Sequence, residues 1–81
     1  MERLTITRTR RYGNSEIQIN NVYSVPRTKT KIDKVISMAN DMMAREQPIT
    51  NEEIEYEVIA SRDNGMQEFI HRVEKLGKRS V

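Results

Sequence analysis

Residues 31–46 read KIDKVISMANDMMARE, and the spacing of their apolar side chains predicts the helix around which the rest of the chain is organised. These side chains recur every three or four positions and form one stripe: Ile32, Val35, Ile36, Ala39, Met42 and Met43. Thr30 is a suitable N-cap, and the pair Gln47 and Pro48 ends the helical pattern. We therefore expect a central amphipathic helix over residues 30–46.

The size and composition of the chain predict one small domain over residues 1–81. A domain of this size has only a modest core, so self-association or a partner protein is expected to matter for its stability. There is no cysteine, which excludes disulfides and thiolate metal sites. No apolar run approaches the roughly 18 residues of a membrane helix, and the N-terminus lacks the apolar core of a signal peptide. We expect a cytoplasmic protein that does not contact membranes.

The N-terminal residues 1–25 predict a basic β-hairpin. Residues 4–12 contain several β-branched side chains, and residues 16–25 contain alternating apolar ones. Gly13 and Asn14 between the two runs tolerate the positive φ of a tight turn. Because an isolated hairpin is barely stable in water, the central helix is expected to cover its apolar face.

A two-residue turn predicts the register of this hairpin. It pairs Leu4 with Tyr23 and Arg10 with Ile17, which matches most of the apolar positions. A three-residue turn would instead place Leu4 opposite Ser24 and lose these matches. In the preferred register the apolar face ends before the turn, so the basic tip is expected to project into solvent.

The basic hairpin is the strongest functional signal in the sequence. Residues 1–34 contain eight Lys and Arg against three acids, whereas residues 35–81 contain six against nine. A two-stranded ribbon fits the major groove of DNA, and arginine and lysine bind phosphates. We therefore predict a small regulatory protein that binds nucleic acid, DNA in preference to RNA, through Arg8, Arg10, Arg11, Tyr12, Arg27, Lys29 and Lys31.

The C-terminal half predicts two shorter helices, forming a helical hairpin over residues 50–77. Thr50 and Glu53 have the spacing of a capping box, which favours a helix over residues 51–62. A second apolar stripe favours another helix over residues 66–76. The expected fold class is α+β, with the N-terminal hairpin on the central helix and two helices after it. The alternative is a third strand over residues 54–61, where Ile, Tyr and Val alternate with Glu.

The predicted helical hairpin resembles the helix-turn-helix of LuxR/GerE-type regulators. The resemblance covers residues 50–77 and rests on Thr50, Asn51, Glu53, Ile54, Val58, Ile59, Ser61, Lys75, Leu76 and Gly77. It implies that Asn64, Gln67 and His71 face the DNA groove. The sequence departs from the family at Gly65 and Arg72, where the family has core positions. The alternative is a plain αα-hairpin that completes the core.

A second interpretation assigns the function to protein binding. Four acidic side chains cluster in one short stretch and offer a surface for a basic protein: Glu52, Glu53, Glu55 and Glu57. On this interpretation the chain is a small inhibitor of the kind that phages make. It binds a host protein or a nucleic-acid-handling enzyme through acidic helices or a hairpin edge. The same edges make a homodimer one expected assembly.

Catalysis has little support in the sequence. His71 is the single histidine and has no second ligand at metal spacing. The chain has three glycines and no phosphate-binding glycine loop. We therefore expect no enzymatic activity, no metal site and no cofactor.

Overall fold

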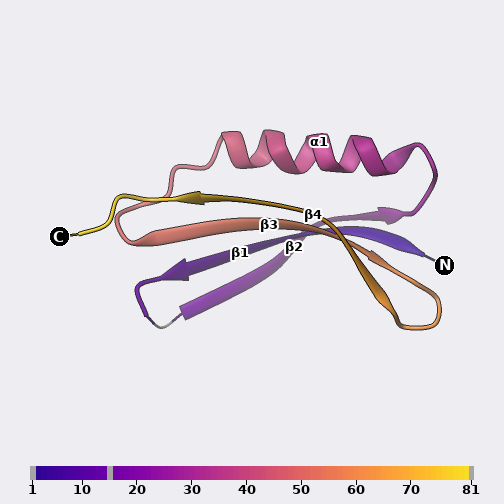
Figure 1. The fold of residues 1–81 in the computed structure, drawn as a ribbon, viewed down its shortest axis with the longest axis horizontal. Helices are drawn as coiled ribbons and strands as arrows, with labels where there is room; N and C mark the ends of the chain where they lie inside the picture. The colour runs from indigo at the N-terminus through magenta and orange to yellow at the C-terminus, as the bar shows by residue number, and fades with distance from the viewer. Residues whose placement is uncertain (1, 15, 81) are drawn as a thin grey trace.

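The computed structural model describes residues 2–14 and 16–80 of the chain. Four strands and one helix follow each other in the order β1 (Arg3–Tyr12), β2 (Glu16–Pro26), α1 (Lys31–Ala44), β3 (Glu52–Ser61) and β4 (Gln67–Leu76). The strands form one antiparallel sheet in the order β2-β1-β3-β4. Figure 1 shows that α1 carries the chain back along the sheet, from the end of β2 to the start of β3.

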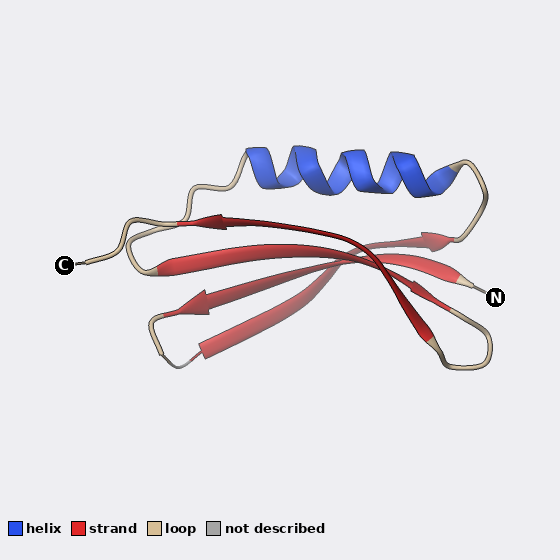
Figure 2. Ribbon diagram, in the orientation of Figure 1, coloured by secondary structure: helices blue, strands red, loops and turns tan. Residues whose placement is uncertain are grey.

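The sheet has one covered face and one open face. Figure 2 shows the single helix on one side of the four strands, and α1 contacts β1, β3 and β4. The N-terminal hairpin and the central helix are present. The expected arrangement of a hairpin, a central helix and two further helices is wrong, because the C-terminal half adds two strands. In the described part of the chain, no helix is long and apolar enough to span a membrane.

The core lies between α1 and the covered face of the sheet. Its buried apolar side chains come from β1, α1 and β3: Leu4, Ile6, Val35, Ala39, Met43, Ile54, Tyr56, Val58 and Ala60. Ile32 and Met42 of the predicted stripe pack against this cluster from its margin. Thr30 is the N-cap residue, but its side chain makes no capping hydrogen bond. Apolar burial on a single face therefore stabilises the fold, and no helix covers the second sheet face in the described part of the chain.

Residues 52–61 form strand β3, so the helix predicted over residues 51–62 is wrong. Every second side chain is buried under α1, which is the period of a strand. Of the two capping-box residues, Glu53 lies in the strand itself and Thr50 belongs to the turn before it. There Asn51 has a positive φ of 66° and the Glu52 amide donates to the Ile49 carbonyl over 3.0 Å. The capping signal favours a helix, whereas the alternation of apolar and polar residues favours a strand. The segment forms a strand because this conformation buries its apolar side chains against α1.

Residues 67–76 form strand β4, so the helix predicted over residues 66–76 and the helical hairpin over residues 50–77 are also wrong. The register between β3 and β4 shifts after Val58, which leaves Ile70 as an extra residue. This bulge places Ile70 and Val73 against the core while Phe69 is exposed. Apolar residues at helical spacing therefore occupy both faces of a bulged strand. A sheet hairpin replaces the helix-turn-helix, so the LuxR/GerE resemblance does not extend to the fold.

The register predicted for the first hairpin is wrong as well. Tyr12 lies opposite Glu16 and Arg10 opposite Gln18, so three residues separate the strands. A β-bulge after Ile6 then restores the apolar match at the other end, where Leu4 lies opposite Val25. A three-residue turn is compatible with the apolar matches only because of this bulge, and the alternation of the sequence does not predict a bulge.

Candidate functional site

Three arginines of the hairpin form ion pairs with glutamates inside the molecule: Arg8, Arg10 and Arg11. Arg8 on the covered face donates from Nε and Nη2 to the two carboxylate oxygens of Glu46, over 2.6 and 3.1 Å. The Tyr56 hydroxyl donates to the same carboxylate over 2.5 Å. Glu46 follows the C-terminus of α1, so this cluster joins the helix end to β1 and β3.

The cluster shifts the pKa of each of its members. The hydrogen bond from Arg8 is the main reason that the pKa of Glu46 lies below its ordinary value. The same hydrogen bond raises the pKa of Arg8. Burial, and next the hydrogen bond to Glu46, raise the pKa of Tyr56 to about 12. At neutral pH the cluster is therefore an ionised pair with a protonated phenol.

Arg10 is held by a second buried carboxylate. Its Nε donates to Glu52 Oε2 over 2.6 Å, and its Nη2 also contacts this oxygen. The side chain of Glu52 is only 3% exposed, and its other oxygen accepts the Ile49 amide over 3.1 Å. A buried carboxylate needs such partners because an unpaired charge inside a protein is costly. Arg10 therefore has a structural role in the turn before β3.

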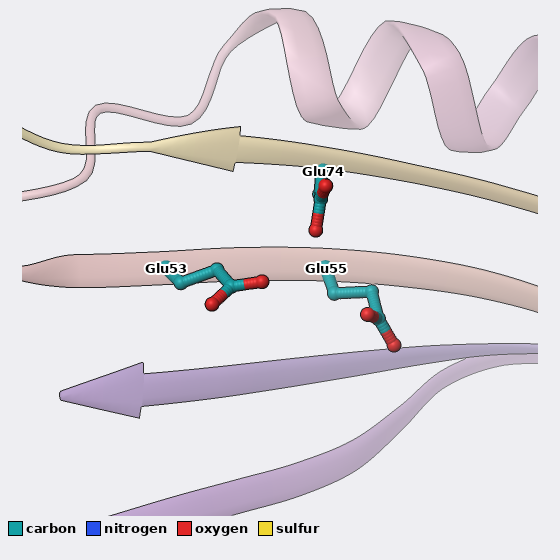
Figure 3. A group of neighbouring side chains, drawn as sticks. All are labelled: Glu53, Glu55 and Glu74. Carbon is teal, nitrogen blue, oxygen red and sulfur yellow. The ribbon is translucent and has the colours of Figure 1, made fainter. Parts of the chain in front are cut away.

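A third ionic network lies on the open face of the sheet. Arg11 Nη1 lies 3.3 Å from Glu53 and 3.4 Å from Glu55, and Arg72 Nε donates to Glu55 over 2.6 Å. Figure 3 shows Glu53 and Glu55 on β3 beside Glu74 on β4. Oxygen atoms of these three carboxylates lie within 4.8 Å of one another, a separation that would also suit a cation. Arg11 and Arg72 already form ion pairs with all three carboxylates, so ion pairing explains the geometry of the group.

Burial raises the pKa of two neighbouring carboxylates of this network, but their net pKa shifts have opposite directions. Burial raises the pKa of Glu55, but hydrogen bonds and charge from Arg72 and Arg11 outweigh it, and the net pKa is lowered. The pKa of Glu57 is raised, first by burial and then by the negative charge of Glu55. Glu57 is therefore the carboxylate of the network whose ionised form is disfavoured.

The residues predicted to bind nucleic acid do not form one surface. Arg8 and Arg10 lie on the covered face of β1, whereas Arg11 lies on the open face. Tyr12 is 52% exposed at the tip. The remaining three, Arg27, Lys29 and Lys31, lie in and next to the β2–α1 connection, at the opposite end of the sheet (Figure 1). Arg27 donates to Glu68 over 3.0 Å.

The acidic residues predicted to bind a partner are also divided between the two faces. Glu52 points to the covered side, where it holds Arg10. Glu53 and Glu55 lie on the open side in ion pairs with arginine. Glu57 follows Glu55 by two residues and therefore lies on the same side. The acidic helix face of the sequence interpretation does not exist, because these residues belong to a strand.

The sequence interpretation missed the exposed apolar side chains of β2. Ile17 and Ile19 are 60% and 64% exposed. They lie opposite Arg11 and Thr9, and therefore on the open face and away from the core. The signal that could have identified them is the lack of charge over residues 17–25, in a chain of which 32% is charged. Phe69 and Leu76 are exposed on the other edge strand.

The remaining candidates offer little chemistry. His71 Nε2 lies 2.9 Å from the side-chain oxygen of Asn40 on α1, so it belongs to the contact between helix and sheet. An open hollow of about 450 Å³ lies between the first hairpin and the C-terminal segment. Its described lining combines Arg11 and Arg79 with Glu52 and Glu53, and it contains no histidine or serine.

Comparison with protein-family models, with curated proteins and with solved structures gives no match for this chain.

Proposed function

We propose that this chain is a small, non-enzymatic protein-binding module that uses the outer edge of β2. The β2 edge comprises residues 16–21, where both faces of the strand are exposed. The observation that carries the proposal is the contrast between this edge and the hairpin arginines. Ile17 and Ile19 have no cover, whereas Arg8, Arg10 and Arg11 are held by glutamates of the same chain.

The chemistry of the β2 edge supports pairing with another strand. β2 lies at one end of the sheet order, so its outer backbone groups have no strand partner among the described residues. An added strand would satisfy these groups, and the two isoleucines would give the contact an apolar component. Ion-paired arginines support nucleic-acid binding less well, because each would first have to leave its carboxylate.

The test is a pull-down from nuclease-treated lysate that compares two double variants. Ile17→Lys with Ile19→Lys places charges on the β2 edge. Met66→Lys with Phe69→Lys changes equally exposed residues of the β3–β4 hairpin and serves as the control. We expect the first variant to lose a protein that the wild type and the control retain. Retention by both variants, or loss of the protein on nuclease treatment, would contradict the proposal.

Nucleic-acid binding is the second candidate, supported by a different group of cations. Lys29, Lys31 and Lys34 lie at the start of α1, and no described carboxylate forms an ion pair with them. The positive end of the helix dipole adds to their field. These lysines, rather than the tip arginines, would then contact phosphate.

This second candidate is tested by the salt dependence of duplex DNA binding. Alanine at Lys29, Lys31 and Lys34 is expected to reduce the slope of log affinity against log salt by about 0.9 for each phosphate that the variant no longer neutralises. A control variant changes Arg45, Lys78 and Arg79, which form no ion pair with described residues, to alanine. Equal slopes for the two variants would exclude the lysines as a specific contact.

A further inference from the structure

We infer that the partner of the β2 edge is a second copy of this chain, which pairs antiparallel with the first around Gln18. This inference rests on the proposed role of the β2 edge and names its occupant. The paired strands would join two sheets into one of eight strands. Three features of the molecule support this pairing: the difference between the two edge strands, the self-complementarity of residues 16–20, and the position of α1.

The two edges of the sheet differ in their protection against strand pairing. β4 carries Glu68, Arg72, Glu74 and Lys75, and α1 packs against it. Lys75 also donates to carbonyls at the end of α1. Charged side chains are how proteins commonly prevent edge pairing. β2 has no charge over residues 17–25, so its edge lacks this protection.

The sequence of the β2 edge is complementary to itself in one register. Pairing around Gln18 places Ile17 of each copy opposite Ile19 of the other, so that four isoleucines meet on the open face. On the other face Gln18 meets its copy and Glu16 meets Asn20, with no like charges opposed. Pairing around Ile19 would instead place Ile17 opposite Asn21, so the Gln18 register buries more apolar surface.

The position of α1 leaves room for the second copy. α1 contacts β1, β3 and β4, and residues 16–21 of β2 are exposed on both faces. A two-fold axis through Gln18 and perpendicular to the sheet keeps both helices on the same side. The contact has only five residues from each copy, and interfaces of this size are weak and reversible. The dimer is therefore expected at protein concentrations of about 0.1–1 mM, and the monomer at a few micromolar.

The oligomeric state is the first measurement. Sedimentation or light scattering of the wild type is expected to show a mass that rises from 9.5 kDa toward twice this value with concentration. Ile19→Lys is expected to stay at the monomer mass, and Phe69→Lys, at the other edge, to behave like the wild type. A monomer mass for the wild type up to about 1 mM would overturn the inference. So would a dimer that Ile19→Lys leaves intact.

The register is tested by single cysteines, because the chain has none of its own. Opposed residues of antiparallel strands have Cα atoms about 4.5–5.5 Å apart, which suits a disulfide. Gln18→Cys is therefore expected to form a disulfide-linked dimer at least tenfold faster than Asn20→Cys, which would lie opposite Glu16. Equal rates, or a faster Asn20→Cys, would overturn the pairing around Gln18.

Failure of the inference can be distinguished from failure of the proposed function. In one outcome the chain stays monomeric, and the Ile17→Lys, Ile19→Lys variant loses a nuclease-resistant protein partner. This outcome contradicts a second copy as the partner, but it still supports the β2 edge as a protein-binding surface. In the other outcome the chain dimerises through β2 and captures no other protein. This outcome supports the second copy as the partner of the β2 edge.

Discussion

The guanidinium of Arg8 and the carboxylate of Glu46 face each other across two hydrogen bonds, of 2.6 and 3.1 Å. Arg8 lies in the middle of β1 and Glu46 just beyond the end of α1, so the pair ties the helix to the sheet. Their side chains are only 21% and 16% exposed. An arginine in this position stabilises the fold, and the carboxylate of Glu46 already balances its charge in the free protein.

Removing this carboxylate is expected to destabilise the protein. Glu46→Ala leaves the charge of Arg8 and the hydroxyl of Tyr56 without their shared partner, which typically costs about 1–3 kcal/mol. Thermal or urea unfolding measures the change. Glu16→Ala is the control, since Glu16 is exposed and makes no ion pair with a described residue. Equal stability of the two variants would show that the pair contributes little.

The titration of Tyr56 provides an independent test of the same cluster. Its pKa of about 12 has two main causes, burial and then the hydrogen bond to Glu46. Glu46→Ala removes the hydrogen bond and the negative charge of Glu46 but not the burial, so the pKa is expected to fall and still remain above that of a free tyrosine. Ultraviolet absorbance against pH measures this value. An unchanged pKa would contradict the hydrogen bond.

The stability of the protein is expected to fall in acid. The pKa values of Glu46 and Glu55 are lower in the folded chain than their ordinary values. Their stabilisation is therefore present above the unfolded pKa and is lost as the pH falls through the folded pKa. Unfolding midpoints measured from about pH 7 down to about pH 3 should decrease, most steeply below the ordinary carboxyl pKa. A constant midpoint would contradict these ion pairs.

Glu57 is expected to act in the opposite direction. Its pKa is raised in the folded chain, so its ionised form costs stability above the folded pKa, and this cost disappears below the unfolded pKa. Glu57→Gln should therefore raise the unfolding midpoint near neutral pH and have no such effect in acid. Glu16→Gln serves as the control. If Glu57→Gln raises the unfolding midpoint equally at neutral and at acidic pH, the stabilisation does not come from the titration of Glu57.

Gly77 is expected to tolerate no side chain. A Cβ atom at this position would lie 1.9 Å from the carbonyl oxygen of Ile49, and the Gly77 amide donates to the Glu52 carbonyl over 2.8 Å. Gly77→Ala should therefore cost about 1–3 kcal/mol, as overpacking does. Gly13 has open space but a φ of 58°. Gly13→Asn, which tolerates this φ, should have little effect on urea unfolding. A similar effect of the two changes would contradict the contact at Gly77.

The fold was predictable where one local signal acted alone. The apolar stripe around Val35 and Ala39 correctly predicted the central helix, and the turn at Gly13 correctly predicted a hairpin. Residues 50–77 were mispredicted because helical spacing and capping signals competed with strand alternation there. A bulge at Ile70 makes helical spacing compatible with a strand, and such a bulge depends on tertiary packing.

The candidate site was less predictable than the fold. The positions of Arg8, Arg10 and Arg11 on the hairpin were clear from the sequence, but their glutamate partners lie 38 to 44 positions further along the chain. The exposure of Ile17 and Ile19 depended on the length of the turn and on the bulge after Ile6. A shift of one residue in register moves side chains to the other face.

Hydrogen exchange of the β2 backbone amides at increasing protein concentration tests the β2 edge most directly. We expect the outward-facing amides of residues 16–20 to exchange more slowly as the protein concentration rises from about 10 µM to about 1 mM, while exchange of the β4 amides does not change. Exchange in β2 that is independent of concentration, or protection that appears at β4 instead, would contradict pairing through the β2 edge.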